Sequence, residues 1–128
     1  MFENACNSTK QGDIGEARAI YEYTRLGFGV SRTLFDSMKY DLVVDFNGSL
    51  KKVQVKTTKC KSRHGVYMAN LKVCGGNSSG NTITNREDSD YDILFVLAED
   101  GTCWSIPVTD FDAKTSLNLG TRYDSYKL

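Results

Sequence analysis

The sequence has few of the residues on which several common kinds of site depend. Histidine occurs once, at His64, which excludes metal sites built from several histidines and serine-histidine catalysis that needs a second histidine. The four cysteines are scattered and form no CxxC pair, which argues against a zinc site and favours reduced thiols. No apolar run approaches the roughly 18 residues of a membrane span. Residues 1–10 contain no apolar signal region, so we expect an intracellular, cytoplasmic protein with no membrane partner.

Acidic residues are missing from the middle of the chain. The formal net charge is zero, with 16 basic and 16 acidic residues. Residues 46–86 nevertheless hold eight basic residues and no acid, whereas residues 87–128 hold nine acids and three bases. An uncompensated basic segment suits phosphate contacts. The alternative is a solvated loop whose charge is balanced by the acidic end of the chain.

A helix is predicted near the N-terminus, where apolar residues recur at helical spacing. Its N-cap is expected at Ser8 or Thr9, and its end near Leu26. Gly12 and Gly15 lie in its first turns, although glycine lowers helix propensity. We therefore expect another backbone, or a ligand, to approach the helix there.

Strands are predicted where apolar and polar residues alternate or where apolar residues cluster. The expected strands are residues 28–31, 40–46, 51–58, 65–70, 91–97 and 103–107. Asn47-Gly48 predicts a tight hairpin between the second and third of these. Residues 74–90, rich in Gly, Asn and Ser, are expected to form a long loop. A short helix should follow Pro107, which gives one α+β domain over residues 1–128, with a mixed sheet.

The Asn47-Gly48 hairpin predicts a site. Gln54 and Lys56 lie two residues apart and therefore on the same face of their strand, and Asp41 can share that face from the preceding strand. The helix can add Glu16. The Asp41 carboxylate, the Gln54 side-chain oxygen and the backbone carbonyl of Val55 are ligands that suit Mg²⁺ (or Mn²⁺), with Glu16 binding directly or through a water. Lys56 would orient or help deprotonate an attacking water and offset phosphate charge, which fits metal-assisted phosphodiester hydrolysis.

Two other carboxylates compete for the role of Asp41. Asp36 precedes the strand, and Asp45 shares the face of Asp41 but lies nearer the hairpin turn. The alternative for Gln54 and Lys56 is a solvated strand face.

The order Glu16, Asp41, Gln54-Val55-Lys56 resembles the PD-(D/E)XK nuclease superfamily, whose core is a helix followed by a strand hairpin carrying Asp and (D/E)XK. The QxK variant is most similar to the homing endonucleases encoded in group I introns that use this fold. The resemblance implies a restriction-endonuclease-like core, with a mixed β-sheet flanked by helices. It also implies a Mg²⁺-dependent endonuclease for double-stranded DNA, in a bacterial or phage context. Tyr40 stands where the motif has proline, and Gln54 stands where most relatives have an acid.

Residues expected to contact DNA come from the basic segment and the Gly-rich loop. Basic side chains would bind phosphate, and Asn and Arg side chains would read base edges. The candidates are Lys51, Lys59, Lys61, Arg63, His64, Asn77, Asn81, Asn85 and Arg86. The alternative is solvated charge and a disordered loop.

These observations predict a site-specific endonuclease of the homing type that hydrolyses phosphodiester bonds. Because one small domain can scarcely surround a duplex or cut both strands, we expect a homodimer or homotetramer. A Holliday-junction resolvase with the same four site residues is one alternative. The other is a catalytically idle DNA-binding module of the same fold, which the neutral Gln54 and zero net charge favour.

Overall fold

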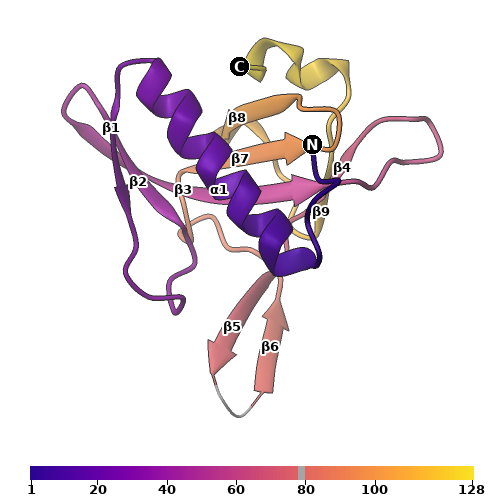
Figure 1. Ribbon diagram of the computed structural model, residues 1–128, viewed down its shortest axis with the longest axis horizontal. Coiled ribbons are helices and arrows are strands. Elements are labelled where there is room, and N and C mark those ends of the chain that lie inside the picture. Colours follow the sequence, from indigo (N-terminus) through magenta and orange to yellow (C-terminus); the bar gives the residue numbers. More distant parts are fainter. Residues whose placement is uncertain (78–79) are drawn as a thin grey trace.

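The structure is a computed structural model that describes the backbone of residues 1–77 and 80–128, and side chains outside residues 73–83. One α-helix crosses a face of the main sheet, and two short two-stranded sheets, one a hairpin and the other a pair of strands far apart in the sequence, lie outside it (Figure 1). In chain order the elements are α1 (Ser8–Arg25), β1 (Gly29–Arg32), β2 (Leu42–Phe46), β3 (Ser49–Thr58), β4 (Met68–Asn70), β5 (Val73–Asn77), β6 (Gly80–Thr84), β7 (Ile93–Ala98), β8 (Cys103–Pro107), the 3₁₀ turn η1 (Val108–Asp110), β9 (Ser116–Asn118) and the 3₁₀ turn η2 (Thr121–Tyr126).

The main sheet has five strands in the order β1-β2-β3-β7-β8. β3 and β7 pair in parallel, and the other neighbours are antiparallel, so the sheet is mixed, as expected. Asn47 and Gly48 both have positive φ, at 56° and 100°, as a two-residue hairpin turn between β2 and β3 requires. In the resulting register Leu42 lies opposite Val53.

Helix α1 is bounded by local signals at both ends. The side chain of Asn7 accepts a hydrogen bond from the Lys10 N–H at 2.8 Å, so the N-cap precedes the predicted Ser8 or Thr9. At the other end, Gly27 adopts a φ of 90° and donates its N–H to the carbonyl of Thr24. This glycine ends the helix because the left-handed conformation costs it little.

At Gly15, α1 packs closely against the sheet. A Cβ on Gly15 would lie 2.5 Å from Thr57 Cγ2 and 3.3 Å from Val55 Cγ1 on β3. A close approach therefore exists at Gly15, but side chains of β3 make it, not the backbone or ligand that the sequence suggested. At Gly12 the expectation is wrong, because a Cβ there would meet nothing within 4 Å.

The sheet is covered on both faces. On one face, Tyr23 and Ala19 of α1 pack on β2, β3 and alternate residues of β7, such as Phe95. On the other face, Leu94 of β7 belongs to a second core cluster with Leu117 of β9 and Tyr123 of η2. β7 therefore runs through the centre of the core, which explains its nearly continuous apolar sequence.

Three charged side chains among the described residues are buried, Glu22, Arg86 and Asp90, and each has hydrogen-bonding or ion-pair partners. The Glu22 carboxylate of α1 accepts hydrogen bonds from Arg18 and Arg25 at 2.9 and 2.6 Å. Arg86 is 1% exposed, and its guanidinium donates to the carbonyls of Ala113 and Phe111. Such pairing is what allows a charge to remain in a protein interior.

Residues 74–90 do not form the long loop that the sequence predicts. β5 and β6 make an antiparallel hairpin that projects from the body of the protein (Figure 1). Its two ends are attached to the same segment: the Leu71 N–H donates to the Thr115 carbonyl, and the Arg86 N–H donates to the Lys114 carbonyl. Gly and Asn depress strand propensity, but backbone pairing across a short hairpin overrides that preference.

The remaining predicted elements differ in detail. The strand expected at residues 65–70 shortens to β4, which pairs with β9. The expected short helix appears as the 3₁₀ turn η1, and the C-terminal η2 packs on the core through Tyr123. In the part of the chain that the structure describes, no helix has the length and apolar character needed to span a membrane.

Candidate active site

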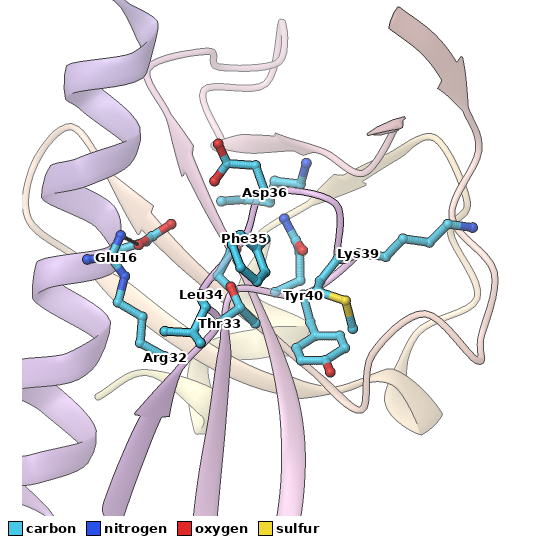
Figure 2. A pocket seen from close by; sticks show the side chains of 12 residues that line it. Glu16, Arg32, Thr33, Leu34, Phe35, Asp36, Lys39 and Tyr40 are labelled. Carbon is cyan, nitrogen blue, oxygen red and sulfur yellow. Dashed lines mark ion pairs between the residues drawn. The ribbon is translucent and has the colours of Figure 1, made fainter. Parts of the chain in front are cut away.

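A cavity of about 510 Å³ opens between α1, the loop that joins β1 to β2, and the face of β3 (Figure 2). All four predicted catalytic side chains line it. The lining residues are Glu16, Arg32, Thr33, Leu34, Phe35, Asp36, Met38, Lys39, Tyr40, Asp41, Gln54 and Lys56. The helix and the hairpin therefore bring together residues that are up to 40 positions apart in the sequence.

Asp41 and the 54–56 segment are fixed to one another through the backbone. The Asp41 N–H donates to the carbonyl of Val53, and the Val55 N–H donates to Asp41 Oδ2 at 2.8 Å. The Asp41 carboxylate is thereby oriented along β3, which leaves Oδ1 as its candidate ligand atom. Burial raises the pKa of Asp41, and the Val55 hydrogen bond and the Lys56 charge oppose that rise.

Glu16 reaches the cavity from α1, one residue after the close contact at Gly15. Its carboxylate lies 3.5 Å from the guanidinium of Arg32 on β1 (Figure 2). Burial raises the pKa of Glu16, and repulsion from Asp41 raises it further, while Arg32 lowers it. Glu16 therefore lies close enough to Asp41 for the Asp41 charge to raise its pKa.

Lys56 connects the cavity to the β5–β6 hairpin. Its ammonium donates to the backbone carbonyl of Lys72, at 3.0 Å, immediately before β5 begins. It also lowers the pKa of Asp41 through its charge. The lysine side chain thus lies between the carboxylate and the base of the hairpin.

The two carboxylates that could replace Asp41 lie in different places. Asp36 lines the same cavity, on the loop before β2, so it remains a candidate. Asp45 lies at the exposed end of the hairpin, where its Oδ1 accepts the Gly48 N–H at 2.6 Å. Asp45 therefore serves the turn rather than the cavity.

The donor atoms fit a hard divalent cation. Burial raises the pKa values of Glu16 and Asp41, the Asp41 charge raises that of Glu16 further, and the Asp36 charge raises that of Asp41 further, so a cation would relieve repulsion among these carboxylates. Among the described residues, no three His, Cys, Asp or Glu side chains are grouped to hold a metal alone. Amide or carbonyl oxygens, waters or phosphate oxygens would therefore complete the coordination of a cation at this site. The Gln54 amide lies beside the Val55 carbonyl, with Nε2 as donor at 3.5 Å. Ligation by both oxygens requires that amide to turn over.

The residues predicted to contact DNA divide into three groups. Lys51, Lys59, Lys61, Arg63, His64 and Asn85 are exposed, and Lys61 also lies over the Tyr67 ring, 4.8 Å from its centroid. The side chains of Asn77 and Asn81 lie outside the described part of the chain. Arg86 is a correction: its guanidinium is buried against backbone carbonyls and the Phe111 ring, so it is not available to a ligand.

Sequence reasoning missed several cavity residues. Arg32 pairs with Glu16, and Lys39 forms an ion pair with Asp90 at 3.4 Å, yet neither belongs to the recognised motif. Leu34 and Phe35 were also missed, although two large apolar residues in a loop without any strand or helix period are a detectable signal.

Comparison with known proteins agrees with this geometry. The model of the PD-(D/E)XK endonuclease family matches residues 6–125. The chain belongs to this family. Protein 5.3 of Escherichia phage T7 is 30% identical over 122 residues, which cover 91% of this chain and 94% of that protein.

A solved structure of the same fold is that of the bacterial homing endonuclease I-Ssp6803I. It is 28% identical to this chain, with a TM-score of 0.77, and the match covers 94% of this chain and 89% of the other. The predicted superfamily and the α+β core with a mixed sheet are thus confirmed. As a member of the PD-(D/E)XK endonuclease family, the chain is a nuclease. Its phage and bacterial relatives agree with the expected context.

Proposed function

We propose that the protein is a Mg²⁺-dependent, site-specific endonuclease for double-stranded DNA, of the homing type. The observation that carries the proposal is the convergence of Glu16, Asp41, Gln54 and Lys56 on one cavity. The similarity to a structure described as a bacterial homing endonuclease supports the substrate and the site specificity.

Each of these residues has a distinct proposed role. Asp41, the Gln54 side-chain oxygen and the Val55 carbonyl would hold the cation, with Glu16 binding it directly or through a water. When bound, Mg²⁺ supplies Lewis acidity that polarises the phosphate and lowers the pKa of an attacking water. Lys56 would donate to a phosphate oxygen or orient the water, since its ammonium already lies near Asp41.

The proposed DNA contacts follow the exposed residues. Lys51, Lys59, Lys61, Arg63 and His64 would bind phosphates. The β5–β6 hairpin has the form of a two-stranded ribbon, which the major groove of B-DNA admits, and would place Asn77, Asn81 and Asn85 near base edges. The Lys56–Lys72 hydrogen bond places the base of this hairpin at the cavity, so groove contacts and the scissile phosphate would lie on one continuous surface.

We also propose that the protein is a homodimer or homotetramer, because the cavity of one chain can cut only one strand of a duplex at a time. Light scattering at micromolar protein concentration should give the mass of two or four chains. The mass of a single chain would contradict this part of the proposal.

The deciding experiment is Mg²⁺-dependent cleavage of supercoiled plasmid and mixed genomic DNA. Discrete products are expected from the wild type, and Asp41→Ala and Lys56→Ala should each lose them. Asp45→Asn is the matched control, since Asp45 lies on the same hairpin but outside the cavity lining, and it should cleave as the wild type does.

Two outcomes would contradict the proposal. Salt-sensitive DNA binding without any Mg²⁺-dependent product and without Mg²⁺ binding in calorimetry would favour the idle DNA-binding module. Preferential cutting of a four-way junction of any sequence over linear duplex would favour a resolvase.

A further inference from the structure

The loop between β1 and β2 exposes large apolar side chains. Leu34 is 89% exposed, Phe35 is 74% exposed, and Met38 is 47% exposed. Residues of this kind are ordinarily drawn into a core, and a cluster of them on the surface marks a contact site. These three also line the cavity that holds the catalytic carboxylates.

The loop is attached at both of its ends. The Thr33 N–H donates to the Asp41 carbonyl at 3.2 Å, which closes the loop beside the catalytic aspartate. Lys39 forms its ion pair with Asp90, ahead of β7. Leu34 and Phe35 are therefore carried at a set position relative to Asp41, between the Glu16 side of the cavity and Lys39 (Figure 2).

The position of Leu34 and Phe35 beside the cavity indicates which kind of molecule would cover them. A second copy of the chain seated on Leu34 and Phe35 would also cover the cavity that they line, and would exclude the substrate. A DNA strand whose phosphate enters the cavity would bring the adjoining bases to the same rim. Three basic side chains in the cavity lining, Arg32, Lys39 and Lys56, can face phosphate oxygens. The lining also holds three acidic side chains, Glu16, Asp36 and Asp41, whose charge a divalent cation that enters with the phosphate would offset.

We propose that Leu34 and Phe35 form a wedge that inserts at the base step beside the scissile phosphate and unstacks it. This inference rests on the proposed function, because it requires a DNA substrate in the cavity. Apolar side chains that enter between base steps kink the duplex, which here would turn the phosphate toward Asp41 and Lys56. Leu34 and Phe35 are thus positioning residues, and steps that unstack easily would be preferred at the cut.

The test uses a short duplex that spans a cut mapped with the wild-type enzyme, with 2-aminopurine on either side of the scissile phosphate. Fluorescence is followed with Ca²⁺ in place of Mg²⁺, so that a divalent cation offsets the cavity carboxylates, and the absence of cleavage under these conditions is checked on a gel. Wild-type protein should raise the 2-aminopurine fluorescence, because an unstacked base is no longer quenched. The double variant Leu34→Ala/Phe35→Ala should bind within about tenfold of wild-type affinity, since phosphate contacts dominate affinity, but should give no rise.

A matched control and a rescue make the result specific. Leu50→Ala removes an equally large exposed side chain (66% exposed) outside the cavity lining and should keep the fluorescence rise. In Mg²⁺, the double variant should cleave the intact duplex at least about tenfold more slowly, and a mismatch at the cut should restore its rate, because a mismatched step costs less to unstack.

Three results would overturn the wedge. The first is wild-type binding without any fluorescence change, and the second is an unchanged rise with the double variant. The third is a lower molar mass of the double variant by light scattering, which would make the loop a contact between copies. If the wild type cleaves no DNA at all, the proposed function itself fails, and that outcome is distinct from these three.

Discussion

Gly15→Ala places a methyl group where α1 meets β3. That methyl carbon would lie 2.5 Å from Thr57 Cγ2, which is closer than carbon atoms tolerate. Thr57 cannot rotate away without cost, because its Oγ1 accepts a hydrogen bond from Gln11 Nε2 at 2.8 Å. The helix must therefore shift from the sheet, or the Gln11–Thr57 bond must break.

The expected size follows from two opposing effects. Replacing glycine by alanine within a helix gains about 1 kcal/mol. Overpacking costs about 1–3 kcal/mol, so the net loss for Gly15→Ala is about 0–2 kcal/mol. Gly12→Ala is the matched control: it makes the same change on the same helix with nothing within 4 Å. That variant should gain about 1 kcal/mol and raise Tm by roughly 3–5 °C.

Activity should respond more strongly than stability. Glu16 follows Gly15 directly, so a shift of the helix moves its carboxylate relative to Asp41. A misplacement of about 1 Å can lower a rate by about 100-fold. Thermal unfolding followed by circular dichroism, and the rate of Mg²⁺-dependent cleavage at a temperature where every variant is folded, measure the two effects.

A compensating change tests the reasoning. Thr57→Ser removes the clashing Cγ2 and keeps the hydroxyl, so the double variant Gly15→Ala/Thr57→Ser should recover both stability and rate relative to Gly15→Ala. Thr57→Ser alone completes the cycle. If Gly15→Ala raises Tm as much as Gly12→Ala does, or if the double variant recovers nothing, the close approach does not hold Glu16 in place.

Further predictions concern the buried residues Glu22 and Arg86 and the proposed metal ligand Gln54. Burial raises the pKa of Glu22, but its hydrogen bonds to Arg25 and Arg18 outweigh burial and leave the pKa below its ordinary value of about 4.5. Glu22→Gln should therefore cost about 1–3 kcal/mol at neutral pH, and the Tm difference from wild type should shrink as the pH falls below 4.5; a difference that does not change with pH would contradict this origin. Arg86→Met should leave the carbonyls of Ala113 and Phe111 without their Arg86 donors, remove the ion pair with the exposed Asp88, and cost about 2–5 kcal/mol in urea unfolding, whereas DNA affinity of the folded variant should stay unchanged if the residue is structural. Gln54→Glu adds a charged oxygen ligand and should tighten Mg²⁺ binding in calorimetry by at least about tenfold, and an unchanged affinity would exclude this side chain from the metal site.

The sequence alone predicts the catalytic residues that line the cavity more accurately than it predicts the structure around them. Strand alternation places Asp41, Gln54 and Lys56 on one face because the side-chain period of a strand is two, and the Asn47-Gly48 turn fixes the register. The place of Glu16 beside this face is predicted because it lies on the N-terminal helix, directly after Gly15, where a close approach is expected. These relations are local, so a single sequence carries them.

The failures come from long-range packing. The sequence predicts that Arg86 is an exposed basic residue, because no nearby residue indicates that its guanidinium will bind the backbone carbonyls of residues 111 and 113. The segment 74–90 reads as a loop by composition, yet cross-strand hydrogen bonds make a hairpin of residues 73–84. Gly12 resembles Gly15 in sequence, and only the arrangement of β3 distinguishes them.

The attachment of the β5–β6 hairpin has an evolutionary consequence. The chain leaves the core at Leu71 and returns at Arg86, and both points are hydrogen-bonded to the adjacent residues Lys114 and Thr115. Because the segment between them begins and ends at neighbouring anchored positions, it can lengthen, shorten or be exchanged while the packing beneath it stays the same. If the hairpin reads the target as proposed, a lineage that keeps Lys56 and Asp41 would acquire a new target by replacing this one ribbon, and grafting the ribbon of a relative between Leu71 and Arg86 would test that route in the laboratory.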